Sequence, residues 1–133
     1  MKLPVPATSH QTVPPIDVEV LFSRCMGNVS FALALLDELE ISGNRLLEEI
    51  VLHTESDAVQ EAAEAAHSLK GATAIIGAES VRELSAKIEA AGRAGESSLL
   101  LDMVHELRAE MDRCLTYIPT LRTDLQRRSS PAR

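Results

Sequence analysis

The sequence predicts an all-α fold, namely an antiparallel up-down-up-down four-helix bundle with a short additional N-terminal helix. Leu, Ala and Glu dominate the composition, whereas aromatic residues, which favour strands, make up only 2% of the 133 residues. Apolar residues recur every three or four positions over four long stretches. Connections of roughly two to six residues join these stretches, so consecutive helices are expected to be antiparallel neighbours.

The two ends of the chain differ from its middle. Residues 1–15 are proline-rich and are expected to form a disordered arm or linker. A first short helix is predicted from Asp17 to Cys25, with Asp17 as its N-cap. The bundle domain is predicted over residues 16–126, and the basic residues 127–133 are expected to be a disordered tail.

The first long helix is predicted from Val29 to about His53. Its apolar stripe is interrupted at Ser42-Gly43-Asn44, yet the apolar phase resumes at Leu46, seven residues after Leu39. We therefore expect a kink or local break within this helix rather than a full turn between two helices.

Three further helices follow. The second long helix is predicted over Ala58–Ile76, capped by the loop 54–57 and ended by Gly77, and the third over Ala78–Ala94. In the last helix, Pro119 is expected to produce a kink or a stop. The core stripe of this helix follows alternating steps of three and four: Leu100, Met103, Leu107, Met111, Cys114, Ile118, Leu121 and Leu125.

Composition also excludes several functions. The net charge of −7 argues against nucleic-acid binding, which needs a basic face. No apolar run approaches the about 18 residues that span a membrane, and no secretory signal is present, so we expect no membrane association and a cytoplasmic protein. Cys25 and Cys114 are far apart and are expected to be reduced thiols.

One histidine stands out by its direction. With Ala62 at the centre of the apolar stripe of its helix, His67 lies at about 140° and faces solvent. Lys70, at about 80°, lies at its flank, and Gly71 lies at about 180°. A core histidine is therefore disfavoured, and an ordinary surface histidine remains the competing interpretation. No metal site is expected, because the other histidines lie in different segments.

The surroundings of His67 favour a functional role. Ala63, Gly71 and Ala74 keep the helix surface low where long charged side chains are usual, and Gly71 costs roughly 1 kcal/mol relative to alanine. Lys70 can hold an anionic group beside the imidazole without competing for its lone pair. We infer a nucleophilic histidine that carries a phosphoryl group and meets a protein partner at close range.

Three stretches of sequence resemble the histidine-containing phosphotransfer (HPt) family. They are HSLKG at 67–71, Gly77-Ala78, and IEAAGRAG at 88–95, in which Ile88 stands where leucine is commoner. The family pattern is a helix with A-H-x-L-K-G, a glycine-alanine turn, and a helix ending near L-E-x-A-x-R-x-G. The resemblance in helix order extends over about residues 16–125.

The resemblance implies a phosphocarrier in a multistep His–Asp phosphorelay. His67 would accept a phosphoryl group from a receiver-domain aspartate and pass it to another receiver, Lys70 would steady the charge, and Gly71 would leave room for the incoming active site. Such a chain would be a monomer without kinase activity or a cofactor of its own, and Mg²⁺ would come with the receiver. Its partners would be response-regulator receiver domains and a sensor or hybrid histidine kinase.

The expected docking surface surrounds His67, and Ile75, at about 220°, is expected to be an exposed apolar residue within it. This surface comprises Ala63, Glu64, His67, Ser68, Lys70, Gly71, Ala74 and Ile75. Two alternatives remain open. The chain could be the phosphoacceptor domain of a chemotaxis-type histidine kinase, or a non-catalytic helical interaction bundle in which His67 is incidental.

Overall fold

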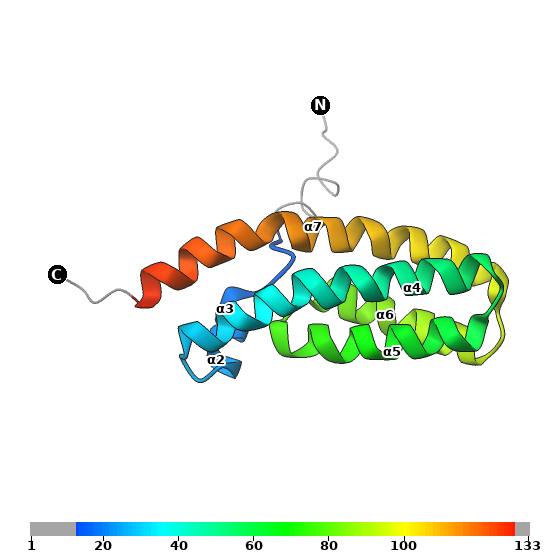
Figure 1. Cartoon of the computed structure of the whole chain (residues 1–133), viewed down its shortest axis with the longest axis horizontal. Coiled ribbons are helices and arrows are strands. Elements are labelled where there is room, and N and C mark those ends of the chain that lie inside the picture. The colour runs from blue at the N-terminus through cyan, green and yellow to red at the C-terminus, as the bar shows by residue number, and fades with distance from the viewer. Residues whose placement is uncertain (1–12, 130–133) are drawn as a thin grey trace, which may run out of the picture.

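The computed structural model of the chain describes residues 13–129, and all of its regular elements there are helical (Figure 1). The predicted all-α class is therefore confirmed. In chain order the elements are α2 (Val18–Arg24), α3 (Val29–Glu38), the π-helical segment η1 (Leu39–Gly43), α4 (Asn44–Glu55), α5 (Val59–Ile76), α6 (Glu79–Arg93) and α7 (Ser97–Ser129).

Four helices form the bundle. α4 packs against α5, α5 against α6, α6 against α7, and α7 against α4, so that the four enclose one core (Figure 1). α3 and η1 continue the line of α4 (Figure 1); α3 packs on the long helix α7, and η1 contacts α5. The short helix α2 lies across this end and contacts α3, α5 and α7.

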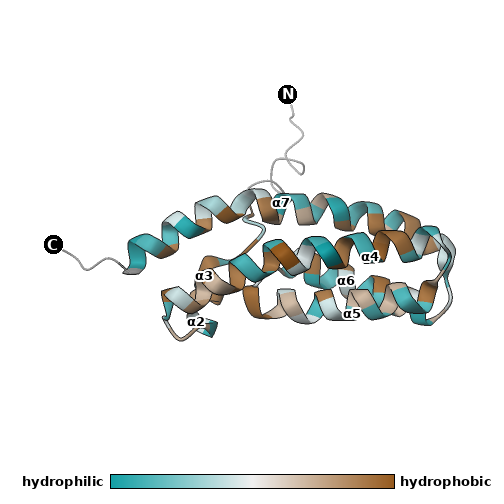
Figure 2. Cartoon of the chain, viewed as in Figure 1, coloured by the Kyte–Doolittle hydropathy of each residue, from teal (hydrophilic) through white to brown (hydrophobic). Residues whose placement is uncertain are grey.

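The core is aliphatic, and hydrophilic residues occupy much of the outer side of each helix (Figure 2). Every residue of the predicted stripe on α7 is buried except Met103, which is half-buried.

Within residues 13–129 no single helix is long and apolar enough to cross a membrane. Only Val18–Arg24 and Val29–Glu55 taken together, with a bend of 114° between them, reach that length and composition.

The predicted break in the first long helix is confirmed, and it takes the form of the π-helix Leu39–Gly43. A π-turn adds one residue to the helix without ending it, which keeps Leu39 and Leu46 both buried. A Cβ at Gly43 would lie 2.9 Å from Cε of Met111 and 3.1 Å from Cδ1 of Leu39, so the ends of these two side chains would have to shift. The absence of a side chain at Gly43 therefore leaves room for Met111 of α7 against the break.

Pro119 does not stop the last helix, which runs as one element to Ser129 and curves along its length (Figure 1). Its neighbour Ile118 is fully buried and Leu121 is 1% exposed, so packing holds the chain helical on both sides of the proline. A proline in a helix costs about 3 kcal/mol, and burial of several large side chains offsets that amount. Of the two expected outcomes at Pro119, a kink or a stop, the stop is therefore wrong.

The tail predicted from residue 127 is also wrong for its first three residues, which are helical. Arg128 Nη2 lies 2.5 Å from Glu19 Oε2, and Arg128 Nε lies 3.0 Å from Asp124 Oδ1. The guanidinium also lies 5.1 Å from the ring centroid of Phe22. These contacts fasten the end of α7 to α2, and residues 130–133 lie outside the described part of the chain.

Part of the predicted N-terminal arm is likewise ordered on the bundle. Arg113 Nη2 donates to the Val13 carbonyl at 2.8 Å, and Cys114 Sγ lies 3.7 Å from the Pro15 carbonyl oxygen. The arm as predicted is therefore wrong at residues 13–15, and residues 1–12 lie outside the described part.

The predicted cap of α5 from the loop 54–57 is wrong. Ala58 occupies the N-cap position, without a side-chain hydrogen bond, and the helix begins at Val59. The loop instead turns through Asp57, whose φ is 59°, and Ala58 donates its backbone N–H to the His53 carbonyl at 2.7 Å. At the other end the prediction holds, because Gly77 ends α5 in the left-handed conformation with φ of 85°.

Candidate functional site

The site is built on α5 and α6, two consecutive antiparallel helices joined by the turn at Gly77 and Ala78. The helices approach closely where α6 has Gly92. A Cβ there would lie 2.6 Å from the Val59 carbonyl oxygen and 2.9 Å from Ala63 Cβ. This close packing brings side chains on the outer edge of α6 within reach of those on α5.

His67 is exposed on α5, and its ring is held from α6. The His67 side chain is 61% exposed, and its Nδ1 lies 3.0 Å from Oε2 of Glu89. The other carboxylate oxygen, Oε1, lies 2.8 Å from Nζ of Lys70. Arg93, one turn further along α6, places Nη2 3.0 Å from Oε2. One carboxylate therefore joins the imidazole to two cations.

The charge of Glu89 is fixed by this arrangement. The hydrogen bond from Lys70 is the largest cause that lowers the pKa of the Glu89 carboxyl; partial burial opposes it, and the bonds from Arg93 and His67 add to it, so that the pKa is about 2. An ionised carboxylate can only accept hydrogen bonds. Nδ1 of His67 is therefore the N–H donor, and in the neutral ring the lone pair lies on Nε2.

Most of the other predicted site residues lie on the side of α5 that the helical phase predicts. Gly71 is exposed, and a Cβ added to it would meet no atom within 4 Å, so nothing inside the bundle requires a glycine there. Glu64 and Ser68 are exposed, Ala74 is half-buried, and Ile75 is 48% exposed. These residues and His67 share the outer face of α5.

The prediction for Ala63 is wrong. Ala63 is fully buried against Gly92 of α6, so it cannot contact a docked protein. Its place at about 100° from the centre of the apolar stripe lies on the flank of the helix. A neighbouring helix covers that flank, and the phase of α5 alone does not reveal how close that neighbour lies.

Sequence reasoning gave no role to Glu89 or Arg93, although both lie in the stretch 88–95. Their signal in the sequence was the four-residue spacing on one face of α6, which allows an ion pair. Nothing in that spacing says that the pair faces His67. The structure adds one further neighbour, because Arg24 of α2 donates from Nη1 to the Ala74 carbonyl near the end of α5.

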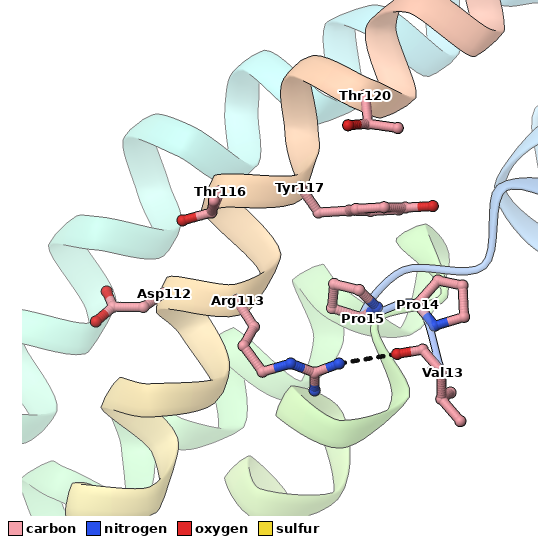
Figure 3. Close-up of a pocket in the computed structure, with 8 residues that line it drawn as sticks. All are labelled: Val13, Pro14, Pro15, Asp112, Arg113, Thr116, Tyr117 and Thr120. Atoms are coloured by element: carbon pink, nitrogen blue, oxygen red, sulfur yellow. Dashed lines mark hydrogen bonds between the residues drawn. The ribbon is translucent and has the colours of Figure 1, made fainter. Parts of the chain in front are cut away.

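A separate cavity of about 680 Å³ lies between residues 13–15 and α7, where Tyr117 extends over the prolines (Figure 3). Its described lining includes no residue of α5 or α6, so it is distinct from the His67 site. It is lined by Val13, Pro14, Pro15, Asp112, Arg113, Thr116, Tyr117 and Thr120.

Among residues 13–129, no three His, Cys, Asp or Glu side chains are grouped so as to hold a metal ion.

The chain is similar to known proteins of one family. The family model described as "Hpt domain" matches residues 34–117, which is more than half of the chain. The crystal structure of histidine-containing phosphotransfer protein B (HptB) from Pseudomonas aeruginosa PAO1 superposes with a TM-score of 0.75 at 21% identity, covering 86% of this chain and 97% of HptB. No curated protein sequence matches the chain.

The structural likeness to HptB establishes the shared helical fold. The family match extends from α3 to Tyr117 in α7 and includes both helices of the His67 site. It favours neither the chemotaxis-type kinase domain nor an interaction bundle with an incidental histidine. The chain therefore belongs to the Hpt domain family, the phosphocarriers of His–Asp phosphorelays.

Proposed function

We propose that this phosphocarrier holds its phosphoryl group on Nε2 of His67. The observation that carries the proposal is the 3.0 Å hydrogen bond from Nδ1 to Glu89 on a ring that is 61% exposed. The bond fixes the tautomer and the orientation of the imidazole, so that Nε2 has a lone pair available for attack. Among the described histidines, His67 has this arrangement on a helix surface with small neighbours.

The transfer itself is an in-line displacement. Nε2 of His67 attacks the phosphorus of an acyl phosphate on a receiver aspartate, the P–O bond to that aspartate breaks, and the carboxylate leaves with the bonding electrons. Lys70 Nζ, next to the imidazole, supplies positive charge for the phosphoryl oxygens. The reverse displacement passes the group to a second receiver.

The absence of a side chain at Gly71 fits close docking. His67 and Gly71 are four residues apart on one face of α5, and the space beside Gly71 is open. A receiver active site can therefore reach Nε2 without displacing a side chain of the carrier. Glu64, Ser68, Ala74 and Ile75 border this space, and the half-exposed Ile75 offers apolar area for the interface.

Hpt domains act with receiver domains and histidine kinases, and they are carriers rather than kinases. We extend this to the present chain as a cytoplasmic monomer that has no kinase activity and binds no nucleic acid, in keeping with its net charge of −7. We expect no cofactor on this chain. The Mg²⁺ that neutralises the transferring phosphoryl group would be bound by the receiver.

A direct test uses a ³²P-labelled receiver domain with Mg²⁺ as donor. We expect the label to pass to the wild-type chain as acid-labile, base-stable phosphate and to be lost in His67→Gln. His105→Gln, which changes an exposed histidine on α7, is the matched control and should accept label normally. Equal labelling of the His67→Gln protein would refute the assignment.

A further inference from the structure

Resting on the proposed phosphorylation of His67, we propose that Glu89 sets how readily phospho-His67 gives up its phosphoryl group. By accepting the Nδ1 hydrogen at 3.0 Å, Glu89 holds a proton on the phosphorylated ring at neutral pH. The carrier is thereby kept in its reactive form. Glu89 acts through the imidazole, so it is a positioning residue.

The protonation state of Nδ1 in the phosphorylated ring matters because it decides whether the leaving group is a neutral imidazole or an imidazolate anion. When a receiver carboxylate oxygen, or a water, attacks the phosphorus, a P–O bond forms and the P–Nε2 bond breaks. The bonding electrons return to Nε2. If Nδ1 carries a proton, the leaving group is a neutral imidazole that keeps this proton. If Nδ1 is bare, the leaving group is an imidazolate anion, which is far more basic and leaves much more slowly.

Charged groups from both helices surround the ring. Lys70 and Glu64 lie about one turn from His67 on α5, and Glu89 and Arg93 come from α6. Before phosphorylation, Glu89 accepts the Nδ1 hydrogen, and the lone pair on Nε2 is available for attack. The phosphoryl group then adds about two negative charges beside the same ring, and these favour its protonation.

Glu89 is held in place for this role. Its side chain is 15% exposed, and Lys70 and Arg93 bind its two oxygens at 2.8 and 3.0 Å, so the carboxylate cannot turn away from Nδ1. The low pKa of Glu89, about 2, keeps it an anion over the whole neutral range. It is therefore an acceptor for the Nδ1–H at every neutral pH, and its negative charge favours retention of that proton on the phosphorylated ring.

The experiment separates this inference from the proposed function by using phosphoramidate, a small donor that needs no partner. Wild type, Glu89→Gln and Glu79→Gln are phosphorylated, and hydrolysis of the phosphohistidine is followed by ³¹P NMR as a function of pH. Glu79 lies on the same helix and binds Arg82 at 2.7 Å, so its variant is a matched control away from His67. His67→Gln shows whether the label is on that residue.

For Glu89→Gln we expect the midpoint of the pH–rate profile to fall by about one pH unit and hydrolysis at pH 7.5 to slow about tenfold. Transfer to a receiver should slow in parallel, and Glu79→Gln should match wild type. A phosphorylated Glu89→Gln protein with the wild-type profile would overturn the inference. Undiminished labelling of His67→Gln would instead overturn the phosphorylation site.

A second variant gives an effect of opposite sign and covers the case in which Glu89→Gln does not fold. Arg93→Gln removes one cation from the Glu89 carboxylate, which Lys70 still holds through Oε1 at 2.8 Å. The Arg93 side chain is 50% exposed, so the fold should be retained. The remaining charges then favour a proton on the ring more strongly. The midpoint should rise and hydrolysis at pH 7.5 should quicken, and a fall in the midpoint would contradict the proposal.

Discussion

Gly92 of α6 and Ala63 of α5 lie in direct contact, and no larger residue fits at position 92 without movement of a helix backbone. A Cβ there would come 2.6 Å from the Val59 carbonyl oxygen, well inside normal contact distance. The contact sets the separation of the two helices that carry His67 and Glu89.

Gly92→Ala should therefore lower the free energy of unfolding by about 1–3 kcal/mol, as overpacking does in other cores. Urea unfolding measures this change. Gly71→Ala is the matched control, because its Cβ meets no atom within 4 Å and the substitution should stabilise the helix by about 1 kcal/mol. A Gly92→Ala protein as stable as wild type would contradict the packing argument.

Substitution of Gly71 by a large residue should separate folding from docking. Gly71→Glu should keep its helical circular dichroism, because the site is open, yet it should lose most phosphotransfer from a receiver domain, because the side chain occupies the approach to His67. Labelling by phosphoramidate should continue in this variant. Normal transfer from the receiver would show that close approach is not required.

The low pKa of Glu89 predicts a defined acid response of stability. The folded-state pKa, about 2, lies below the ordinary 4.5, so the contribution of this group is fully present above pH 4.5 and is lost as pH falls toward 2. Glu89→Gln should be less stable than wild type at pH 7 by about 1 kcal/mol after solvent screening. The difference should vanish near pH 2 in parallel urea titrations, and a difference independent of pH would contradict it.

Pro119 should cost stability despite the continuity of α7. Pro119→Ala restores a backbone donor toward the Leu115 carbonyl in an exposed position, so we expect stabilisation by about 1 kcal/mol or more. Thr120→Ala, at the next exposed position, should gain only about 0.5 kcal/mol from helix propensity. Thermal unfolding compares the two variants, and a destabilised Pro119→Ala protein would mean that the proline is required for packing.

The Cys114 thiol should be inert in the folded protein. It is 1% exposed, and burial raises its pKa to about 12, so the reactive thiolate is almost absent at pH 8. In a Cys25→Ser background, labelling of Cys114 by a thiol reagent should follow the rate of unfolding and become fast in urea. Rapid labelling without denaturant would show that this part of α7 opens locally.

The elements that could be predicted from sequence are those governed by one helix at a time. The stripe ending in Leu125, the break near Gly43 and the outward direction of His67 follow from helical phase and glycine chemistry. The burial of Ala63 and the bond from His67 to Glu89 depend on how closely α5 and α6 pack, and that distance is set by Gly92. Pro119 shows the same limit, because tertiary packing outweighs a local propensity.

The site joins residues that are 22 positions apart, across a single tight turn. Closing so short a loop costs little chain entropy, and contacts of this range are among the first to form when helical proteins fold. The α5–α6 hairpin can therefore assemble its histidine and carboxylate before α7, which ends far along the chain, has docked. In hydrogen exchange, we expect amides of α5 next to His67 to be protected early in refolding, ahead of those near the end of α7.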